Sequence, residues 1–319
     1  MSLHEEILQY SRQDTMKPLS NWFSNLLSES IESGVYGDKN QLEETGRRLV
    51  DGIRDYGEKY NINRVAIGMS GGVDSALTAA MFKDAGWSVL GVTMPIHQNP
   101  EETDRGIAAC ETLGIEHKQV DLTKTYDQLL KTFQDHDSTL KDDDQKLRRG
   151  NLRVRLRMMT IYNEASRIRG LVASTDNFSE LAAGFWTLHG DVGDLAPIQS
   201  LSKSWEVPRL AEMFGVPKET VFAKPTDGLG ISDGDEAQFG FSYLEFDLVL
   251  LTLCQSGMLS TREDCLNFLN VPESEADHVN KILDRIRMST FKRTNPYNLT
   301  HPIQTNRYTG LNIIDSALW

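Results

Sequence analysis

The sequence predicts an α/β protein built on an open parallel sheet with helices on both faces. Short apolar segments typical of buried strands alternate with longer segments that have helical spacing or helix end signals. Strands that alternate with helices form βαβ units, in which the strands run parallel. One strand also leads through a glycine turn directly into a helix, at the edge where such sheets bind ligands.

The first elements are a helix, a strand and a second helix. Apolar residues recur at helical spacing over residues 39–60, and a compact apolar strand follows at 64–69. Residues 73–86 are rich in alanine and end in a glycine, which predicts a helix with a stop signal.

Two strands and two further helices follow. Strands are expected at 88–94 and 116–121, and the helix between them, at 100–114, has a proline and acids at its start and a glycine at its end. Residues 144–169 predict a long helix, with an interruption near Gly150 as an open alternative.

A fourth strand is expected at 171–175, directly after the long helix. Residues 243–290 have helical patterning and no clear strand, so the C-terminal part is expected to be helical. We expect two units along the chain: a helical N-terminal extension over 1–35 and a single α/β domain over 36–319.

Composition and charge exclude several classes of function. Hydrophobic residues make up 39% of the chain and charged residues 25%, which are ordinary globular values. The net charge of −13 argues against a nucleic-acid partner, because such binding depends on Lys and Arg. No apolar run suits a membrane span or a secretory signal, and Cys110, Cys254 and Cys265 form no CxxC pair. We therefore expect a cytoplasmic enzyme that does not bind membranes.

The stretch RVAIGMSGGVDS, residues 64–75, places two glycines and a carboxylate at the end of the first strand. Gly71 and Gly72 allow a tight turn, and the helix that follows presents free N–H groups to an anion. The Walker pattern GxxxxGK[ST] is absent. Asp74 would repel a phosphate without an intervening cation, which implies Mg²⁺. The alternative is an ordinary turn in which Asp74 caps the helix.

SGGVDS resembles the pyrophosphate loop of the N-type ATP pyrophosphatases, which cleave ATP between the α and β phosphates and form an adenylated intermediate. Further stretches resemble the ammonia-dependent NAD synthetases of that superfamily, in the family's order and over roughly residues 40–300. These stretches are GNLRVRLRM at 150–158, the long segment at 174–203, the loop at 224–247 that begins with a Pro-Thr pair, and FKRTNP at 291–296.

The sequence departs from the family pattern at three places. Asn177 stands where the family usually has a histidine after Thr-Asp, and Phe291 replaces the histidine of the C-terminal H-K-R motif. The segment GDVGDLAP at 190–197 is shortened, which affects the alignment of Asp194.

The resemblance implies a Rossmann-like fold of the adenine nucleotide alpha hydrolase type and a homodimer. It implies ATP-dependent amidation of deamido-NAD with ammonia, which gives NAD, AMP and pyrophosphate as the final step of NAD biosynthesis. A glutamine-using enzyme would need an additional nitrilase-like domain, for which the chain has no room.

The resemblance also implies roles for individual residues. Mg²⁺ would be held by Asp74 and Glu180, and catalysis would use Asp74, Asp191 near the ammonia site and Lys203 near the ATP phosphates. The ATP-binding residues would be Gly68, Ser70, Gly71, Gly72, Val73, Asp74, Ser75, Arg157, Thr175, Lys203 and Thr226. Deamido-NAD would contact Arg155, Asp194 and Lys292, and Thr175 would lie near it too.

Other interpretations of these residues stay open. Arg149, Arg153 and Arg157 share one face of a helix, and a solvated basic face is the alternative to ligand binding at the start of that helix. Residues 224–242 form either a plain surface loop or a lid that shields an adenylate from water.

Three other functions can be weighed against NAD synthesis. A tRNA-thiolating enzyme would need a basic RNA face and paired cysteines. A nucleotide-sensing module would seldom need Asp74, Glu180 and the arginine helix together. A GMP synthetase would carry an appended glutamine-hydrolysing domain.

Overall fold

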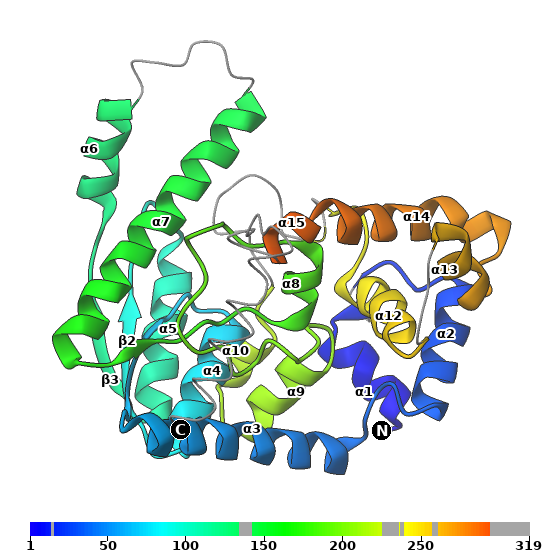
Figure 1. Ribbon diagram of the computed structural model, residues 1–319, viewed down its shortest axis with the longest axis horizontal. Coiled ribbons are helices and arrows are strands. Elements are labelled where there is room, and N and C mark those ends of the chain that lie inside the picture. Colours follow the sequence, from blue (N-terminus) through cyan, green and yellow to red (C-terminus); the bar gives the residue numbers. More distant parts are fainter. Residues whose placement is uncertain (14–15, 134–141, 225–235, 237–238, 257–260, 294–319) are drawn as a thin grey trace, which may run out of the picture.

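Four parallel strands form the centre of the structure (Figure 1). The computed structural model of the protein describes residues 1–13, 16–133, 142–224, 236, 239–256 and 261–293. The strands lie in the order β3-β2-β1-β4, with the bounds β1 (Arg64–Gly68), β2 (Ser88–Thr93), β3 (Glu116–Gln119) and β4 (Leu171–Val172). The predicted parallel sheet is confirmed.

The strand order places β1 between β2 and β4. After β3, at one edge, the chain crosses back and adds β4 to the other side of β1. In parallel sheets such a reversal opens a crevice at the carboxyl ends of the flanking strands, where ligands bind. The glycine turn after β1 lies at this crevice.

Helices cover both faces of the sheet, as predicted. On one face lie α6 (Thr123–Phe133) and α7 (Asp142–Ile168), and on the other lie α4 (Val73–Asp84) and α5 (Pro100–Leu113). Successive strand residues point to opposite faces, so β1, β2 and β4 each contribute to two separate hydrophobic cores. The architecture is Rossmann-like.

Local capping signals set the ends of the predicted helices. α3 (Lys39–Tyr60) begins with a capping box between Asp38 and Gln41. α5 begins after Asn99, which caps the backbone N–H of Glu101, and ends at Gly114 in the left-handed conformation. Both helices match the ranges expected from the sequence.

The long helix α7 runs without interruption through Gly150. A glycine in a helix interior costs only about 1 kcal/mol relative to alanine, and packing can outweigh that cost. Leu156 and Ile161 supply the packing, because both are buried in the core between α7 and the sheet.

The fourth strand is shorter than the predicted 171–175. β4 ends at Val172, and Ala173 forms only an isolated bridge with Leu195. The backbone N–H of Ser174 donates to the carbonyl oxygen of Leu195 at 2.9 Å. A segment from later in the chain thus pairs with the residues that were expected to extend the strand.

The remaining helices stand beside the sheet, and α12, α13 and α14 lie with α1 and α2 on the right of Figure 1. They are α1 (Leu3–Tyr10), α2 (Asn21–Glu32), α8 (Phe178–Ala183), α9 (Glu206–Met213), α10 (Lys218–Val221), α12 (Tyr243–Cys254), α13 (Arg262–Phe268), α14 (Glu273–Met288) and α15 (Thr290–Arg293). Ile7, Phe23 and Leu27 share one core with α9 and α12. A domain boundary at residue 36 stays a prediction.

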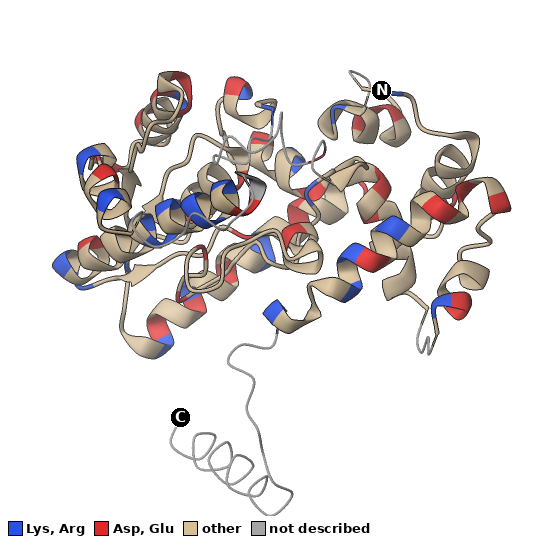
Figure 2. Ribbon diagram, turned by 90° about the horizontal axis from the view of Figure 1, so that it is seen from above, with Lys and Arg blue, Asp and Glu red and all other residues tan. Residues whose placement is uncertain are grey.

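Within the described part of the chain, none of the helices combines the length and the apolar character that crossing a bilayer requires. Acidic and basic residues are interspersed over most of the helices in the view of Figure 2.

Gly193 provides a test of the unusual pairing beside β4. A Cβ at this position would lie 2.5 Å from the backbone nitrogen of Ser174 and 2.6 Å from the carbonyl oxygen of Val172. We expect Gly193→Ala to lower the free energy of unfolding by about 1–3 kcal/mol, because the backbone has to move apart. Gly52→Ala is the matched control, since nothing lies within 4 Å of its Cβ.

In the control, alanine replaces glycine inside helix α3, which should stabilise the protein by about 0.5–1 kcal/mol. Urea unfolding of both variants measures the two effects. Equal stability of Gly193→Ala and the wild type would contradict the close approach at residue 193.

Candidate active site

A cavity of about 660 Å³ opens at the carboxyl ends of β1 and β4. Its volume lies within the range of pockets that bind small molecules. Most of the residues singled out from the sequence line it, namely Gly68, Ser70, Gly71, Gly72, Val73, Asp74, Ser75, Arg155, Arg157, Thr175, Glu180, Asp191, Lys203 and Lys292.

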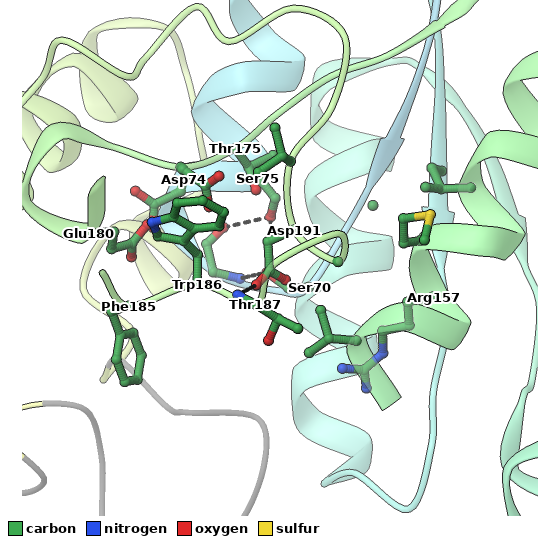
Figure 3. Close-up of a pocket in the computed structure, with 18 of the residues that line it drawn as sticks. Ser70, Asp74, Ser75, Arg157, Thr175, Glu180, Phe185, Trp186, Thr187 and Asp191 are labelled. Carbon is green, nitrogen blue, oxygen red and sulfur yellow. Dashed lines mark hydrogen bonds between the residues drawn. The ribbon is translucent and has the colours of Figure 1, made fainter. Parts of the chain in front are cut away.

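The glycine turn after β1 is pressed against helix α5. Gly71 has a φ of +84°, and a Cβ there would lie 2.1 Å from the carbonyl oxygen of Glu102. The turn is closed by hydroxyl contacts: Ser75 Oγ donates to the carbonyl oxygen of Gly72 at 3.0 Å and lies 3.3 Å from Ser70 Oγ (Figure 3). The first N–H groups of α4 follow this turn, which suits an anion.

Asp74 does not cap helix α4. The residue at the helix N-cap is Gly72, which makes no side-chain capping bond. The carboxylate of Asp74 instead accepts hydrogen bonds from Asn177 Nδ2, at 2.8 Å, and from Lys203 Nζ. The alternative of a capped turn is therefore wrong, and Asp74 belongs to a cluster of charges.

Lys203 lies between two carboxylates that come from different segments. Its ammonium donates to Asp74 Oδ2 and to Glu180 Oε1, the latter at 3.0 Å. The three side chains are only 10–14% exposed. Figure 3 shows Asp74 and Glu180 on the same side of the cavity, with Arg157 on the far side. Such charge-assisted bonds in a poorly solvated place are strong and fix the side chains.

Asn177 positions both carboxylates. It is fully buried and forms the N-cap of α8, where its Oδ1 accepts from the backbone N–H of Glu180 at 3.0 Å. Its Nδ2 donates to Asp74. The side chain of Asn177 thus ties the start of α8 to the start of α4.

A second buried network holds the backbone around Lys203. Ser179 Oγ accepts from the backbone N–H of Lys203 at 2.9 Å and donates to Asp247 Oδ1 at 2.5 Å. Asp247 Oδ2 accepts from the backbone N–H of Ser204 at 2.9 Å. Burial raises the pKa of Asp247 to about 6, against the opposing effect of these hydrogen bonds. Helix α12 thereby fixes the position of the lysine.

Two further carboxyl groups line the cavity. Asp191 Oδ2 accepts from the backbone N–H of Thr187 at 2.6 Å (Figure 3), and burial raises the pKa of Asp191. Asp176 is 7% exposed and accepts from Ser174 Oγ at 3.1 Å. Burial raises the pKa of Asp176 well above its usual range, and the negative charge of Asp191 is the second cause.

The arginines of α7 do not form a uniform solvated face. Arg157 donates from Nε to the carbonyl oxygen of Met94 at 3.0 Å and from a terminal nitrogen to Gln98 Oε1 at 2.7 Å. Burial lowers the pKa of this guanidinium. Arg155 donates to the carbonyl oxygen of Leu188 at 3.2 Å. Both arginines line the cavity.

Cations from the C-terminal helices cap the end of α8. Lys292 Nζ donates to the carbonyl oxygens of Gly184, at 2.6 Å, and of Trp186. Arg285 Nε donates to the carbonyl oxygen of Ala183 at 2.6 Å. Cations bind favourably to the free carbonyls at a helix C-terminus. These bonds shape the turn that carries Phe185 and Trp186 into the cavity wall.

Asp194 lies outside the cavity lining. Its two oxygens accept from the hydroxyl of Tyr162 at 3.0 Å and from the backbone N–H of Val172 at 2.8 Å. Burial raises the pKa of Tyr162 to about 12, and its hydrogen bond to Asp194 is the second cause. Thr226 and most of the proposed lid over 224–242 lie outside the described residues.

Several residues of the site were not singled out from the sequence. They are Arg105, Asp176, Phe185, Trp186 and Thr187, all of which line the cavity. Asp176 carries a usable signal, because it directly follows Thr175 after the fourth strand. Phe185, Trp186 and Thr187 lie in the segment at 174–203 that resembles the family, which could have pointed to them. The place of Arg105 depends on the contact between α5 and the glycine turn, which no local pattern encodes.

The pair of carboxylates is compatible with Mg²⁺. Among the residues that the structure describes, no three His, Cys, Asp or Glu side chains are grouped to hold a metal ion. Mg²⁺ commonly uses one or two carboxylates together with water and substrate phosphates. Asp74 and Glu180 beside an anion-binding turn match that donor set.

Comparisons with known proteins agree on a family. Residues 45–296 match the family model described as NAD synthase. The NH₃-dependent NAD⁺ synthetase of Methanocaldococcus jannaschii is 35% identical over 262 residues, covering 80% of this chain and 96% of that protein. The enzyme of the same name from Mycoplasmopsis pulmonis is 38% identical over 219 residues, covering 68% and 82%.

Solved structures show the same relationship. NMN synthetase from Francisella tularensis aligns with a TM-score of 0.67 at 26% identity, over 82% of this chain and 98% of that one. The NH₃-dependent NAD synthetase from Campylobacter jejuni, solved with a nitrate ion, has a TM-score of 0.63 at 26% identity, over 81% and 99%. With most of its length matched by the family model and by these relatives, the chain belongs to the NAD synthase family.

Proposed function

We propose that the protein is a ligase that amidates deamido-NAD with ammonia and ATP, giving NAD, AMP and pyrophosphate as the final step of NAD biosynthesis. One observation carries the proposal: Asp74 and Glu180 meet around Lys203 beside the glycine turn, in a chain of the NAD synthase family. This arrangement suits the phosphates of ATP.

The chemistry requires activation of a carboxylate, which is a poor electrophile. An oxygen of the nicotinate carboxylate attacks the α-phosphorus of ATP, and the bond to the bridging oxygen breaks as pyrophosphate leaves. Ammonia then attacks the carboxyl carbon of the acyl-adenylate, and AMP leaves. No side chain becomes covalently attached, so catalysis depends on positioning and charge neutralisation.

The residues of the turn would hold the departing pyrophosphate. Ser70–Ser75 and the first N–H groups of α4 would bind its oxygens, and Asp74 and Glu180 would hold Mg²⁺. A Mg²⁺ ion in that position would neutralise phosphate charge. Lys203 would exchange its two carboxylates for phosphate oxygens when the nucleotide binds, because Mg²⁺ held by Asp74 and Glu180 would take the place of the ammonium between them.

Asp191 is the residue that we assign to the ammonia site. It lines the cavity, and burial raises its pKa, which favours acceptance of a proton from an incoming ammonium ion. We assign Arg155 to the binding of deamido-NAD and Arg157 to the binding of ATP. Lys292 would bind deamido-NAD from the turn that it caps.

The finer features of the proposal rest on the family resemblance. These are the use of Mg²⁺, a homodimer, a cytoplasmic location, and contacts of Thr175, Asp194 and Thr226 with the substrates. The described cysteines give no support to tRNA thiolation, because Cys110 is buried and no disulfide links Cys110, Cys254 and Cys265.

The reaction itself is the first test. With ATP, Mg²⁺, ammonium and deamido-NAD, we expect stoichiometric NAD and AMP, measured by mass spectrometry. Nicotinic acid mononucleotide should be used poorly; it is the competing substrate to include, because an NMN synthetase is among the similar structures. Ammonium-free glutamine should also support turnover poorly. Faster amidation of the mononucleotide, or equal rates with glutamine, would contradict the proposal.

Asp74→Asn and Glu180→Gln test the metal pair. Both changes keep the shape but remove the charge that Mg²⁺ requires. We expect near-wild-type melting temperatures and a loss of at least about a hundredfold in AMP formation, which higher Mg²⁺ partly restores. Glu164→Gln is the control, since Glu164 is a buried ion-paired acid outside the cavity lining. Full activity of Asp74→Asn would refute the role of this pair.

Lys203→Met tests the exchange of partners. Without the ammonium, two neighbouring carboxylates repel each other, so a free divalent cation should bind more tightly. We expect the affinity for Mn²⁺ without nucleotide to rise at least about tenfold, comparable to one charged hydrogen bond. Electron paramagnetic resonance of free Mn²⁺ measures it, with Lys118→Met as the control for the loss of one paired lysine. Unchanged Mn²⁺ affinity would show that Lys203 does not compete with the metal.

A further inference from the structure

Helix α5 forms a second wall of the glycine turn. The backbone of Glu102 lies so close to Gly71 that a Cβ there would come within 2.1 Å of its carbonyl oxygen. At the next turn of the helix, a Cβ on Gly106 would lie 2.9 Å from the carbonyl oxygen of Met69. The two backbones are in direct contact, so the helix holds its neighbouring side chains at a fixed place relative to the turn.

Arg105 is the side chain that this contact brings to the turn. It is half-buried, lines the cavity and donates from Nε to the carbonyl oxygen of Gly71 at 3.3 Å. A guanidinium carries five N–H groups, and this bond uses one of them. Within the described residues Arg105 makes no other hydrogen bond or ion pair.

Other cations of the cavity are held elsewhere. Lys203 lies between two carboxylates, Lys292 donates to two carbonyls after α8, and Arg157 donates to Met94 and Gln98. Among the residues that the structure describes, Arg105 is the cationic side chain that bonds to the glycine turn itself. Its remaining N–H groups form the planar fork that binds two phosphate oxygens at once.

We propose that Arg105 binds the β and γ phosphates of ATP and holds the pyrophosphate after the bond to the α-phosphorus breaks. As that bond breaks, its electron pair passes to the bridging oxygen of pyrophosphate, and a guanidinium beside the turn stabilises the added charge. No proton transfer is needed. The inference rests on the proposed function and adds α5 to the elements that bind ATP.

Arg105→Gln tests the proposal, because glutamine can still donate to the carbonyl of Gly71 but carries no charge. Arg48→Gln is the matched control: it removes one positive charge from a side chain that is 78% exposed on α3. Isothermal titration calorimetry of each protein uses two probes, pyrophosphate with Mg²⁺ and AMP. We expect Arg105→Gln to weaken pyrophosphate binding about ten- to a hundredfold and AMP binding less than about twofold. Arg48→Gln should change neither.

Arg105→Lys is a second variant, which keeps the charge but not the fork, and it should bind pyrophosphate between the wild type and Arg105→Gln. If Arg105→Gln loses equal affinity for pyrophosphate and for AMP, Arg105 only supports the turn and the proposal is overturned. The proposal is also overturned if Arg105→Gln binds pyrophosphate as tightly as Arg48→Gln does. Failure of the wild type to form NAD would instead contradict the proposed function, and that assay comes before the variants are compared.

Discussion

The ion cluster of Lys203 with Asp74 and Glu180 is the constraint on which the site depends. Charges that are removed from water need partners, and removal of one partner leaves another charge uncompensated. The surrounding structure supplies the geometry: Asn177 donates to Asp74 and caps Glu180, while Asp247 and Ser179 fix the backbone at the lysine. Rigid support of this kind would let the cluster exchange its ionic partners, as proposed above, without rearrangement of the fold.

The strand order explains why these residues meet. Because β4 is added beside β1, the helices that follow both strands begin at the same edge of the sheet. α4 and α8 thus bring their first turns together, although Asp74 and Asn177 are 103 residues apart. The short length of β4 contributes, because the segment that pairs with Ala173 leads back from the turn holding Asp191.

Features that depend on local spacing could be predicted from the sequence. The helix at 39–60, the glycine turn and the helix at 100–114 follow from apolar periodicity, capping residues and glycine, all within a few neighbours. The family motifs pointed to most of the cavity lining. Contacts between distant segments could not be foreseen, such as the bond from Asn177 to Asp74 or the capping of α8 by Lys292. The unbroken helix at Gly150 likewise depends on packing against the sheet.

The charge of −13 is compatible with anionic substrates because electrostatic effects are local. At physiological ionic strength, charges further apart than about 8 Å are largely screened. Acidic and basic residues are interspersed over the helices (Figure 2), and the cavity wall contains Arg105, Arg155, Arg157, Lys203, Arg285 and Lys292 together with Asp74, Glu102, Asp176, Glu180 and Asp191. In the proposed function, these nearby cations would contact the nucleotide, and Asp74 and Glu180 would act on its phosphates through Mg²⁺. A long nucleic acid would extend past the cavity and meet the rest of a chain whose net charge is −13, so the net charge argues against that partner and not against ATP.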